Sequence, residues 1–349
     1  MIPLAEVIVL IVGYRSPQDI VGCLGALSRV RTGPYFDVFI AENGGPAAMS
    51  ALMEALAGAK EPYRLVSDAE PVIRPSAAPR QCQFQLTGVG DCREMRVHVA
   101  EMSENLGYAG AINAWLRPLL RMPGWRGAWI LNPDTEPAPE ALAELVAYST
   151  ERGKGMVGSR IVVPTTPDLV RTRGLAWRKL SARTIAVDYC TPAALEPDMT
   201  DVEARMDAPS GSSFYVTRDM IERIGLMDER YFLFFEDLEW GCRAKALGGL
   251  GHAHRSIVPH AGGTTIGSGS SRATMSPLSV YLEFRNRIMF VREKHRAWLP
   301  WTVLMLACHA ATFLVAGSVA NTLAAGRGLA AGLKGETGRP DRMLHMHKA

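Results

Sequence analysis

The feature that most constrains the fold is a short apolar run near the N-terminus, residues 6–13, which reads Glu-Val-Ile-Val-Leu-Ile-Val-Gly. Continuous β-branched runs of this length are typical of strands that are buried on both faces of a parallel sheet. Ser16 and Pro17 then begin a helical pattern, because proline suits the first turn of a helix. A second apolar run over 36–41 and a helical pattern over 47–57 repeat this order. The alternation predicts an α/β fold with a doubly wound sheet.

Further along the chain the regularity varies. Short apolar runs predict strands at 127–131, 156–163 and 212–216. Residues 61–100 contain four prolines and fit a local hairpin or an insertion, whereas residues 164–208 are polar and weakly periodic. We therefore expect 164–208 to be an irregular excursion over the surface.

The chain divides most naturally near residue 280. We expect one α/β domain over 1–280, with halves of about 1–135 and 136–280, followed by a helical extension over 281–349. The composition, 48% hydrophobic and 21% charged, is that of a folded chain and excludes a disordered one. The six cysteines form no Cys-x-x-Cys pair, which argues against a structural zinc site and fits a reducing compartment. Residues 1–12 lack the basic start and cleavage site of a signal peptide.

The net positive charge of the chain is concentrated in the extension. Residues 281–349 contain ten basic and four acidic residues, although the whole chain has a net charge of only +3. Between them lies an uncharged stretch, 297–326, which begins with Trp298 and Trp301 and is long enough to cross a bilayer. We favour an in-plane helical pair with the basic stretch 285–296 against lipid headgroups. The alternative is a helical hairpin packed on the catalytic domain or on a second subunit.

Two acidic segments follow apolar runs. Asp134 comes directly after the strand at 127–131, where ligands of open α/β sheets bind, and it can hold a divalent cation or simply close a turn. Glu236 and Asp237 follow an aromatic run and precede a helix. They can stabilise the helix start, or they can serve as a tuned general base.

Two further segments have weaker patterns. His260 follows a strand-like run and precedes two glycines, so it can join a metal or contact a phosphate. The segment Ser103–Asn113 has two glycines that permit close backbone approach, and its amides at Asn105 and Asn113 can bond a sugar or a phosphate. It lacks the dinucleotide-binding and P-loop patterns, and an ordinary helix start would also explain it.

Taken in order, these segments resemble the family 2 inverting glycosyltransferases, which have a GT-A fold, a Rossmann-like, doubly wound mixed sheet. The resemblance covers about residues 6–296 and is greatest to the rhamnosyltransferase-like branch of bacterial polysaccharide biosynthesis. The matching segments are Val9–Tyr14, Asn105–Gly110 with Asn113, Leu131–Asp134, Gly211–Phe214, Phe235–Asp237 with Arg243, and His260–Gly263.

The resemblance implies a role for each position. Asp237 would be the catalytic base, and Glu236 beside it would help to bind the acceptor. Asp134 and His260 would contact the metal, Mg²⁺ or Mn²⁺. The residues implied on the donor and nucleotide side are Val12, Tyr14, Glu42, Asn105, Gly107, Gly110, Asn113 and Asn132. Gly211 and Ser212 would line the acceptor side. The chain departs from the family pattern at Glu42, where aspartate is common, and at Asn132, which takes the first acidic place of the metal motif.

The function implied is transfer of a hexosyl group, with rhamnose as one candidate, from a nucleoside diphosphate donor such as dTDP- or UDP-sugar. The acceptor would be a saccharide or a polyprenyl-linked one in exopolysaccharide or O-antigen synthesis. We expect a cytoplasmic enzyme, peripheral on the inner face of the cell membrane, with a homodimer as one option, and the charge pattern favours a membrane surface over a nucleic-acid partner. A sugar nucleotidyltransferase and a non-catalytic membrane-associated scaffold are the alternatives, and the first would need a basic glycine-rich loop after the first strand.

Overall fold

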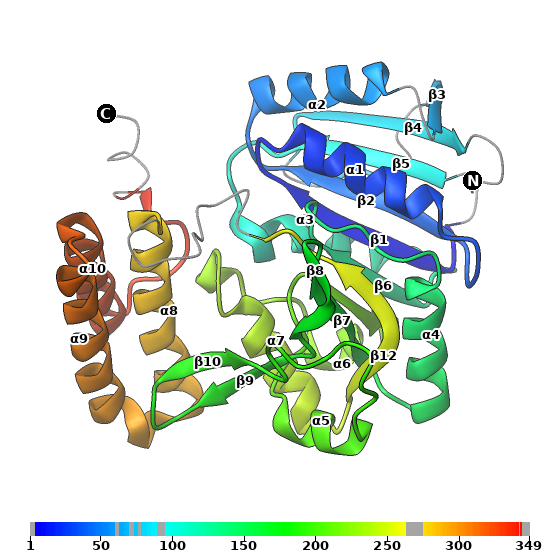
Figure 1. The fold of residues 1–349 in the computed structure, drawn as a ribbon. Coiled ribbons are helices and arrows are strands. Elements are labelled where there is room, and N and C mark those ends of the chain that lie inside the picture. The colour runs from blue at the N-terminus through cyan, green and yellow to red at the C-terminus, as the bar shows by residue number, and fades with distance from the viewer. Residues whose placement is uncertain are drawn as a thin grey trace.

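In a computed structural model of the chain, the described residues are 4–59, 63–69, 73–75, 78–88, 95–262, 275–341 and 343. They form a mixed α/β fold around one large sheet, with a group of helices at the C-terminal side (Figure 1). The sheet order is β12-β7-β11-β6-β1-β2-β5-β4-β3, and β8 pairs with β7 outside this path. The predicted fold class, a doubly wound mixed sheet with a helical extension, is confirmed. Gly263 of the predicted motif lies outside the described residues.

The strands of the large sheet are β1 (Val7–Gly13), β2 (Phe36–Glu42), β3 (Tyr63–Ala69), β4 (Arg80–Gly88), β5 (Met95–Glu101), β6 (Gly127–Leu131), β7 (Met156–Val163), β8 (Thr166–Thr172), β11 (Ser213–Thr217) and β12 (Leu250–Pro259). The helices of this domain are α1 (Pro17–Ser28), α2 (Pro46–Gly58), α3 (Gly107–Leu119), α4 (Ala141–Arg152), α5 (Met199–Arg205), α6 (Arg218–Ile224) and α7 (Glu236–Ala246), with a 3₁₀ turn η1 (Glu229–Tyr231).

The apolar run that opens the chain is the central strand β1, paired in parallel with β2 and β6. It is buried on both faces because helices cover both. One core cluster joins the sheet to α1, α2 and α4, and a second joins it to α3, α6 and α7. Burial on both faces is the reason for its continuous, non-alternating apolar sequence.

The antiparallel strand β11 makes the sheet mixed. It lies between β6 and β7, so its beginning meets the end of β6. The N–H of Asn132 donates to the carbonyl of Ser212 at 2.9 Å. Two segments 80 residues apart in sequence are thereby joined at the carboxyl edge of the sheet, where ligands of such folds bind.

The two less regular segments take ordered forms. Within 61–100, β4 and β5 pair antiparallel as the hairpin interpretation predicted, and they extend the main sheet. The prediction of an irregular excursion over 164–208 is wrong. This segment contains β8, α5 and a separate hairpin of β9 (Leu175–Arg178) and β10 (Arg183–Ala186). The hairpin buries Trp177 against residues of α7 and α8, and Ala176 joins the core cluster on one face of the large sheet.

The C-terminal extension is helical, as expected. It consists of α8 (Pro277–Lys294), a 3₁₀ turn η2 (Arg296–Trp298), α9 (Leu299–Val315) and α10 (Val319–Lys334). Gly328 and Gly332 allow α10 to lie directly on α8, because a Cβ at either position would come within 3 Å of an α8 backbone carbonyl. The hairpin β9–β10 reaches toward the start of α9 (Figure 1), where the Trp301 indole donates to the carbonyl of Leu180 at 2.8 Å.

The basic stretch 285–296 is only partly as predicted. Arg292 and Arg296 are exposed, but Arg285 and Arg287 are 1% and 8% exposed and point into the protein. The expectation that these two arginines contact lipid headgroups is therefore wrong. The Arg285 guanidinium donates to the carbonyls of Tyr231 and Gly338, because α8 is packed against the polypeptide that leads into α7.

Candidate active site

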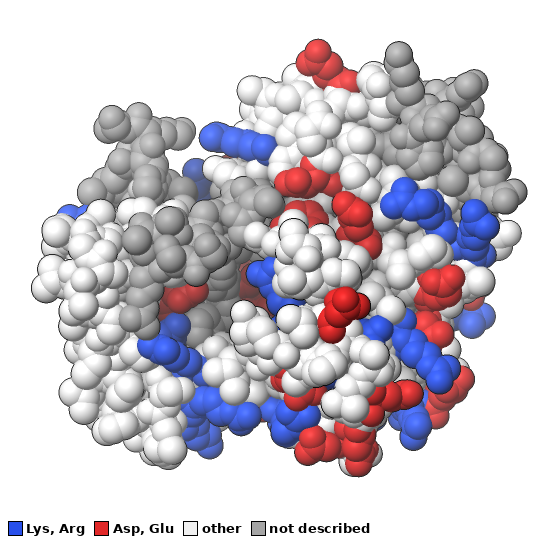
Figure 2. Space-filling view, in the orientation of Figure 1, with Lys and Arg blue, Asp and Glu red and all other residues white. Residues whose placement is uncertain are grey.

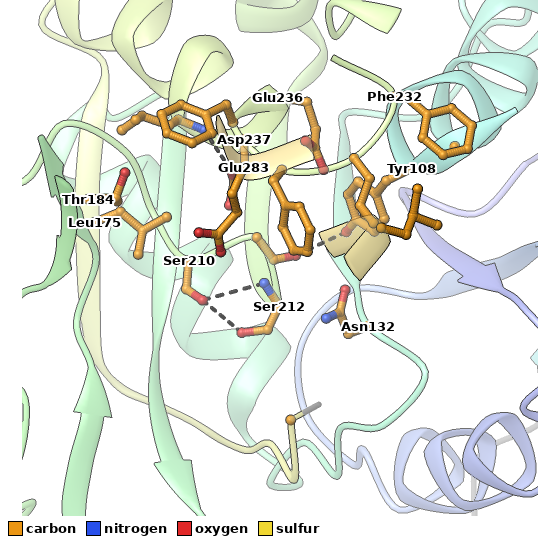
Figure 3. Close-up of a pocket in the computed structure, with 18 of the residues that line it drawn as sticks. Tyr108, Asn132, Leu175, Thr184, Ser210, Ser212, Phe232, Glu236, Asp237 and Glu283 are labelled. Atoms are coloured by element: carbon orange, nitrogen blue, oxygen red, sulfur yellow. Dashed lines mark hydrogen bonds between the residues drawn. The ribbon is translucent and has the colours of Figure 1, made fainter. Parts of the chain in front are cut away.

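A cavity of about 690 Å³ opens at the carboxyl edge of the sheet and continues toward α8 and α9. Figure 3 shows side chains from the sheet domain converging on it, and Figure 2 shows the surface hollowed between the sheet domain and the C-terminal helices. Most of the residues that the sequence singled out line this cavity: Val12, Tyr14, Asn105, Gly107, Asn132, Asp134, Gly211, Ser212, Glu236, Asp237 and His260.

Three predicted residues do not line it: Glu42, Gly110 and Asn113. Asn113 is 1% exposed, and its amide donates to Met227 and Glu229, so it fastens α3 to the segment before η1. The Glu42 carboxylate is buried and accepts from the backbone N–H groups of Arg15 and Gly44 at 3.2 and 2.7 Å. Burial raises the pKa of Glu42, and its role here is to hold the loops after β1 and β2 together.

Asp134 and His260 are neighbours. The Nε2 atom of His260 lies 3.1 Å from Oδ1 of Asp134, and the N–H of Gly262 donates to Oδ2 of Asp134 at 3.2 Å. An isolated backbone bridge between Thr135 and His260 joins the segments that follow β6 and β12. Asp134 and His260, 126 positions apart in sequence, therefore lie side by side. One carboxylate and one imidazole suit a divalent ion such as Mn²⁺. Among the described residues no group of three or more His, Cys, Asp or Glu side chains is placed to hold a metal, so ligands beyond these two would come from substrate and water.

Glu236 and Asp237 begin α7 at the opposite wall. Asp237 Oδ1 accepts from the N–H of Leu238 at 2.7 Å. Burial raises the pKa of Asp237, and backbone N–H groups of Leu238 and Gly211 oppose that rise. Burial and the neighbouring Asp237 carboxylate raise the pKa of Glu236 well above its usual range. Two adjacent carboxyls with raised pKa values, Glu236 buried and Asp237 half-buried, are an arrangement suited to proton transfer.

The turn before α7 is strained. Phe232, Phe234 and Phe235 have φ angles of 65°, 68° and 74°, which bulky residues rarely adopt. The Asn286 amide on α8 holds this turn, because its Nδ2 lies within 3 Å of the carbonyls of Tyr231, Leu233 and Phe234. The strain and its support fix the place of the two carboxyls that follow.

Gly211 and Gly107 are glycines because the backbone must come close to this turn. A Cβ at Gly211 would lie 2.6 Å from Oδ2 of Asp237. A Cβ at Gly107, where φ is 72°, would lie 2.2 Å from the carbonyl of Phe232. The Tyr108 hydroxyl donates to the carbonyl of Gly211 at 3.0 Å, so the glycine-rich start of α3 is joined to the loop before β11 (Figure 3).

Sequence reasoning missed several lining residues. Tyr108 lies within the segment Ser103–Asn113, which the sequence had already indicated as a candidate ligand contact, so it could have been predicted. Arg171, Arg183, Glu283, Arg287 and His309 also line the cavity. They come from β8, β10, α8 and α9, where the pattern had indicated surface and lipid contact.

Three comparisons place this geometry among known proteins. No family model matches the chain. The N-acetylglucosaminyl-diphospho-decaprenol L-rhamnosyltransferase of Mycobacterium tuberculosis is 26% identical over 239 residues, which are 60% of this chain and 73% of the relative. The low-salt glycan biosynthesis hexosyltransferase Agl10 of Haloferax volcanii is 22% identical over 265 residues, 72% of this chain and 80% of the relative.

Among solved structures, the mannosyltransferase PcManGT from Pyrobaculum calidifontis, in complex with GDP-Man and Mn²⁺, is similar at a TM-score of 0.47 and 12% identity, covering 95% of this chain and 87% of that one. Residues 1–349 of Staphylococcus aureus TarS in complex with UDP-GlcNAc are similar at a TM-score of 0.46 and 12% identity, covering 86% of this chain and 70% of that one. The class that the curated relatives define is that of the glycosyltransferases. The resemblance expected from the sequence is confirmed, and the chain is an enzyme of that class.

Proposed function

We propose that this enzyme transfers a sugar from a nucleoside diphosphate donor to an acceptor hydroxyl with inversion, and that Asp237 is the base. The observation that carries the proposal is that Asp237 and Asp134 line one cavity. The N–H of Leu238 at the start of α7 holds Asp237, and the N–H of Gly262 holds Asp134. An inverting transfer needs a base on one side of the reacting carbon and charge stabilisation of the leaving group on the other.

Asp237 takes the proton of the acceptor hydroxyl as that oxygen attacks. Its raised pKa makes it a stronger base than an exposed aspartate, and it is still ionised once the pH exceeds that pKa. Glu236, whose pKa is raised further, donates a hydrogen bond to the acceptor in its protonated form. Asp237 thus acts as the base and Glu236 as a hydrogen-bond donor, because their surroundings separate their pKa values.

Asp134 and His260 would hold a Mn²⁺ or Mg²⁺ ion, which when bound neutralises the negative charge of the leaving nucleoside diphosphate. The donor lies along the wall that contains Val12, Tyr14, Asn105, Gly107 and Asn132. Gly211 and Ser212, next to Asp237, belong to the acceptor side. A rhamnosyl donor carried by dTDP or UDP is our first choice, since one relative is a rhamnosyltransferase.

The acceptor is a saccharide carried on a polyprenyl diphosphate, used in building a cell-surface polysaccharide. The rhamnosyltransferase relative acts on a decaprenol-linked acceptor by its name. In the described residues one helical stretch, Arg296–Val315, is long and apolar enough to cross a membrane by length and composition, with 22% of its apolar window buried. Figure 2 shows an almost uncharged surface over α9 and α10. Its exposed large apolar side chains are Trp301, Leu304, Leu314, Val315, Val319, Leu323 and Leu333.

We therefore place α9 and α10 on the inner face of the cell membrane. Flotation with vesicles that contain anionic lipid tests this. Val315→Glu, at a side chain 90% exposed, should lose most vesicle binding, whereas Leu247→Glu, a comparable change on the sheet domain, should keep it. Equal flotation of the two variants contradicts the placement.

Calorimetry with UDP, dTDP and GDP, each with and without Mn²⁺, tests the transferase site itself. Wild-type protein should bind one nucleotide more tightly with the metal. Asp134→Asn should lose the metal-dependent part of the affinity, and Asp237→Asn should keep it but lose turnover. Asp219→Asn, an exposed acid on α6, is the matched control. A folded wild-type protein that binds none of the nucleotides would refute the proposal.

A further inference from the structure

The end of the cavity nearest the C-terminal helices holds a second polar cluster, which the transfer chemistry does not use. Arg183 on β10 and Arg287 on α8 both line the cavity, and His309 on α9 lies between them. The Arg183 Nε atom donates to His309 Nε2 at 3.1 Å. An Nη atom of Arg287 lies 3.5 Å from the other ring nitrogen, Nδ1. Two cationic side chains from distant parts of the chain thus face one imidazole.

This arrangement is short of acceptors. A neutral imidazole accepts at one ring nitrogen only, and a protonated one accepts at neither. His309 therefore cannot serve both guanidinium groups. Arg287 is 8% exposed, and its buried Nε has no hydrogen-bond partner. Among the described residues, Glu283 is the acid that forms an ion pair with Arg287, at 3.3 Å.

The surroundings make this shortage costly. The Arg287 guanidinium lies between the rings of Phe235 and Phe284, at 5.9 and 5.8 Å from their centroids. Burial lowers the pKa of Arg287, the Glu283 carboxylate opposes this, and the positive charge of Arg183 lowers the pKa again. Buried cations are normally paired with anions, because leaving them unpaired costs several kcal/mol. An anionic ligand with several acceptor oxygens would complete the cluster.

We infer that Arg183, Arg287 and His309 bind the diphosphate of a lipid-linked acceptor. This inference rests on the proposed function and names its acceptor site. Arginine forks match phosphate oxygens with paired N–H donors. The Phe235 ring that Arg287 contacts comes two residues before Asp237, so a diphosphate held here leaves its sugar near the base.

The lining beyond the cluster suits a hydrocarbon chain. Leu278, Phe284 and Phe313 line the same cavity on its α8 and α9 side. Directly after Phe313 come Leu314 and Val315, which are 59% and 90% exposed on the apolar face. The cavity thus combines an acid, cations and apolar side chains in its lining. These three kinds of group suit a sugar, a diphosphate and a prenyl chain.

Geranyl diphosphate is a soluble probe for this subsite, titrated by calorimetry into protein alone and into protein saturated with Mn²⁺ and the best-binding nucleoside diphosphate. Wild-type protein should bind it in both cases. Arg183→Gln and Arg287→Gln should each weaken binding by about tenfold or more, the effect of losing a charge-assisted contact. Arg178→Gln, an exposed arginine directly opposite Arg183 in the hairpin register, should bind as the wild type does.

Three results would overturn the inference. The first is that folded wild-type protein does not bind geranyl diphosphate, the second is that the nucleotide competes fully with it, and the third is that Arg178→Gln weakens its binding as much as the two test variants do. Inorganic diphosphate that binds as tightly, with the same response to the variants, would show a site for free phosphoryl ligands instead. If Arg287→Gln fails to fold, Arg183→Gln on the half-buried hairpin decides alone. Nucleotide binding without probe binding refutes this subsite and leaves the transferase proposal intact. Probe binding without nucleotide binding does the reverse.

Discussion

Gly211→Ala offers a direct test of how the base is positioned. The Cβ added at this residue would lie 2.6 Å from Oδ2 of Asp237 and 3.2 Å from its Cγ. Ordinary contacts begin near 3.4 Å, so the carboxylate or the backbone must move by about 0.8 Å. The Asp237 side chain cannot yield easily, because it is bonded to the N–H of Leu238 and stands after the strained turn at Phe235.

We expect kcat to fall about 100-fold, since a displacement of roughly 1 Å at a reacting group has this effect. In free energy this is about 2.7 kcal/mol of transition-state stabilisation. Nucleotide and Mn²⁺ binding should be unchanged, because Asp134 and His260 do not contact Gly211. The stability cost should be small beside the loss of rate, on the order of 1 kcal/mol for one added methyl group.

The assay is steady-state transfer with a donor and a short-chain lipid-linked acceptor, alongside calorimetry of nucleotide binding and a thermal melt. Gly22→Ala is the matched control. It lies on the exposed face of α1, where a Cβ meets nothing within 4 Å, and alanine should stabilise the helix by about 0.5–1 kcal/mol. A Gly211→Ala enzyme whose kcat stays within about twofold of wild type would refute the positioning argument, because a twofold change corresponds to well under about 1 kcal/mol of activation free energy.

Three further predictions follow from the same wall of the cavity. Because the pKa of Glu236 is raised in the folded state, that state holds a proton which the unfolded chain loses above its ordinary pKa, so this group's contribution to stability falls as pH rises. Glu236→Gln should therefore raise Tm more at pH 8 than at pH 5, and a gain independent of pH in parallel melts would contradict this. Asn286→Ala should lower the free energy of unfolding, measured with urea, by about 3 kcal/mol, since three backbone carbonyls lose their donor. A loss under about 1 kcal/mol would show that the turn keeps its conformation without the Asn286 amide. Gly107→Ala should cost about 2 kcal/mol or more through its positive φ and its contact with Phe232, and an unchanged unfolding midpoint would exclude that strain.

The sequence predicted the part of the site that lies at strand ends. Asp134 follows β6 and His260 follows β12, and apolar runs of this kind identify buried strands whose carboxyl ends share one edge of the sheet. The rule singled out Asp134, and the family resemblance assigned His260 to the same metal site. The rule could not tell Glu42, which turns back to bind two loop N–H groups, from a residue that faces the cavity.

The contribution of α8 could not be predicted from the sequence, because its charges were the misleading signal. Arginines are rarely buried, so a basic stretch ordinarily indicates a solvent- or lipid-facing helix. Here α8 is covered by α9, α10 and the turn before α7, which leaves Arg285 and Arg287 inside. Contacts that are distant in sequence surround them: Arg285 donates to Tyr231, 54 residues away, and Arg287 lies over the ring of Phe235, which precedes α7.

This burial gives the C-terminal helices a part in catalysis that a membrane anchor alone would not have. Asn286 supports the backbone of the turn from Tyr231 to Phe234, and Glu236 and Asp237 begin the helix that follows at once. Arg287, one residue further along α8, lies in the cavity beside Phe235. Under the proposed function, a helix that contacts α9 and α10 on one side and the turn before α7 on the other can join acceptor binding to the position of Asp237. Removing residues 277–349 should therefore abolish transfer even from a water-soluble acceptor. A truncated enzyme that is folded and fully active on such an acceptor would show that α8 contributes attachment only.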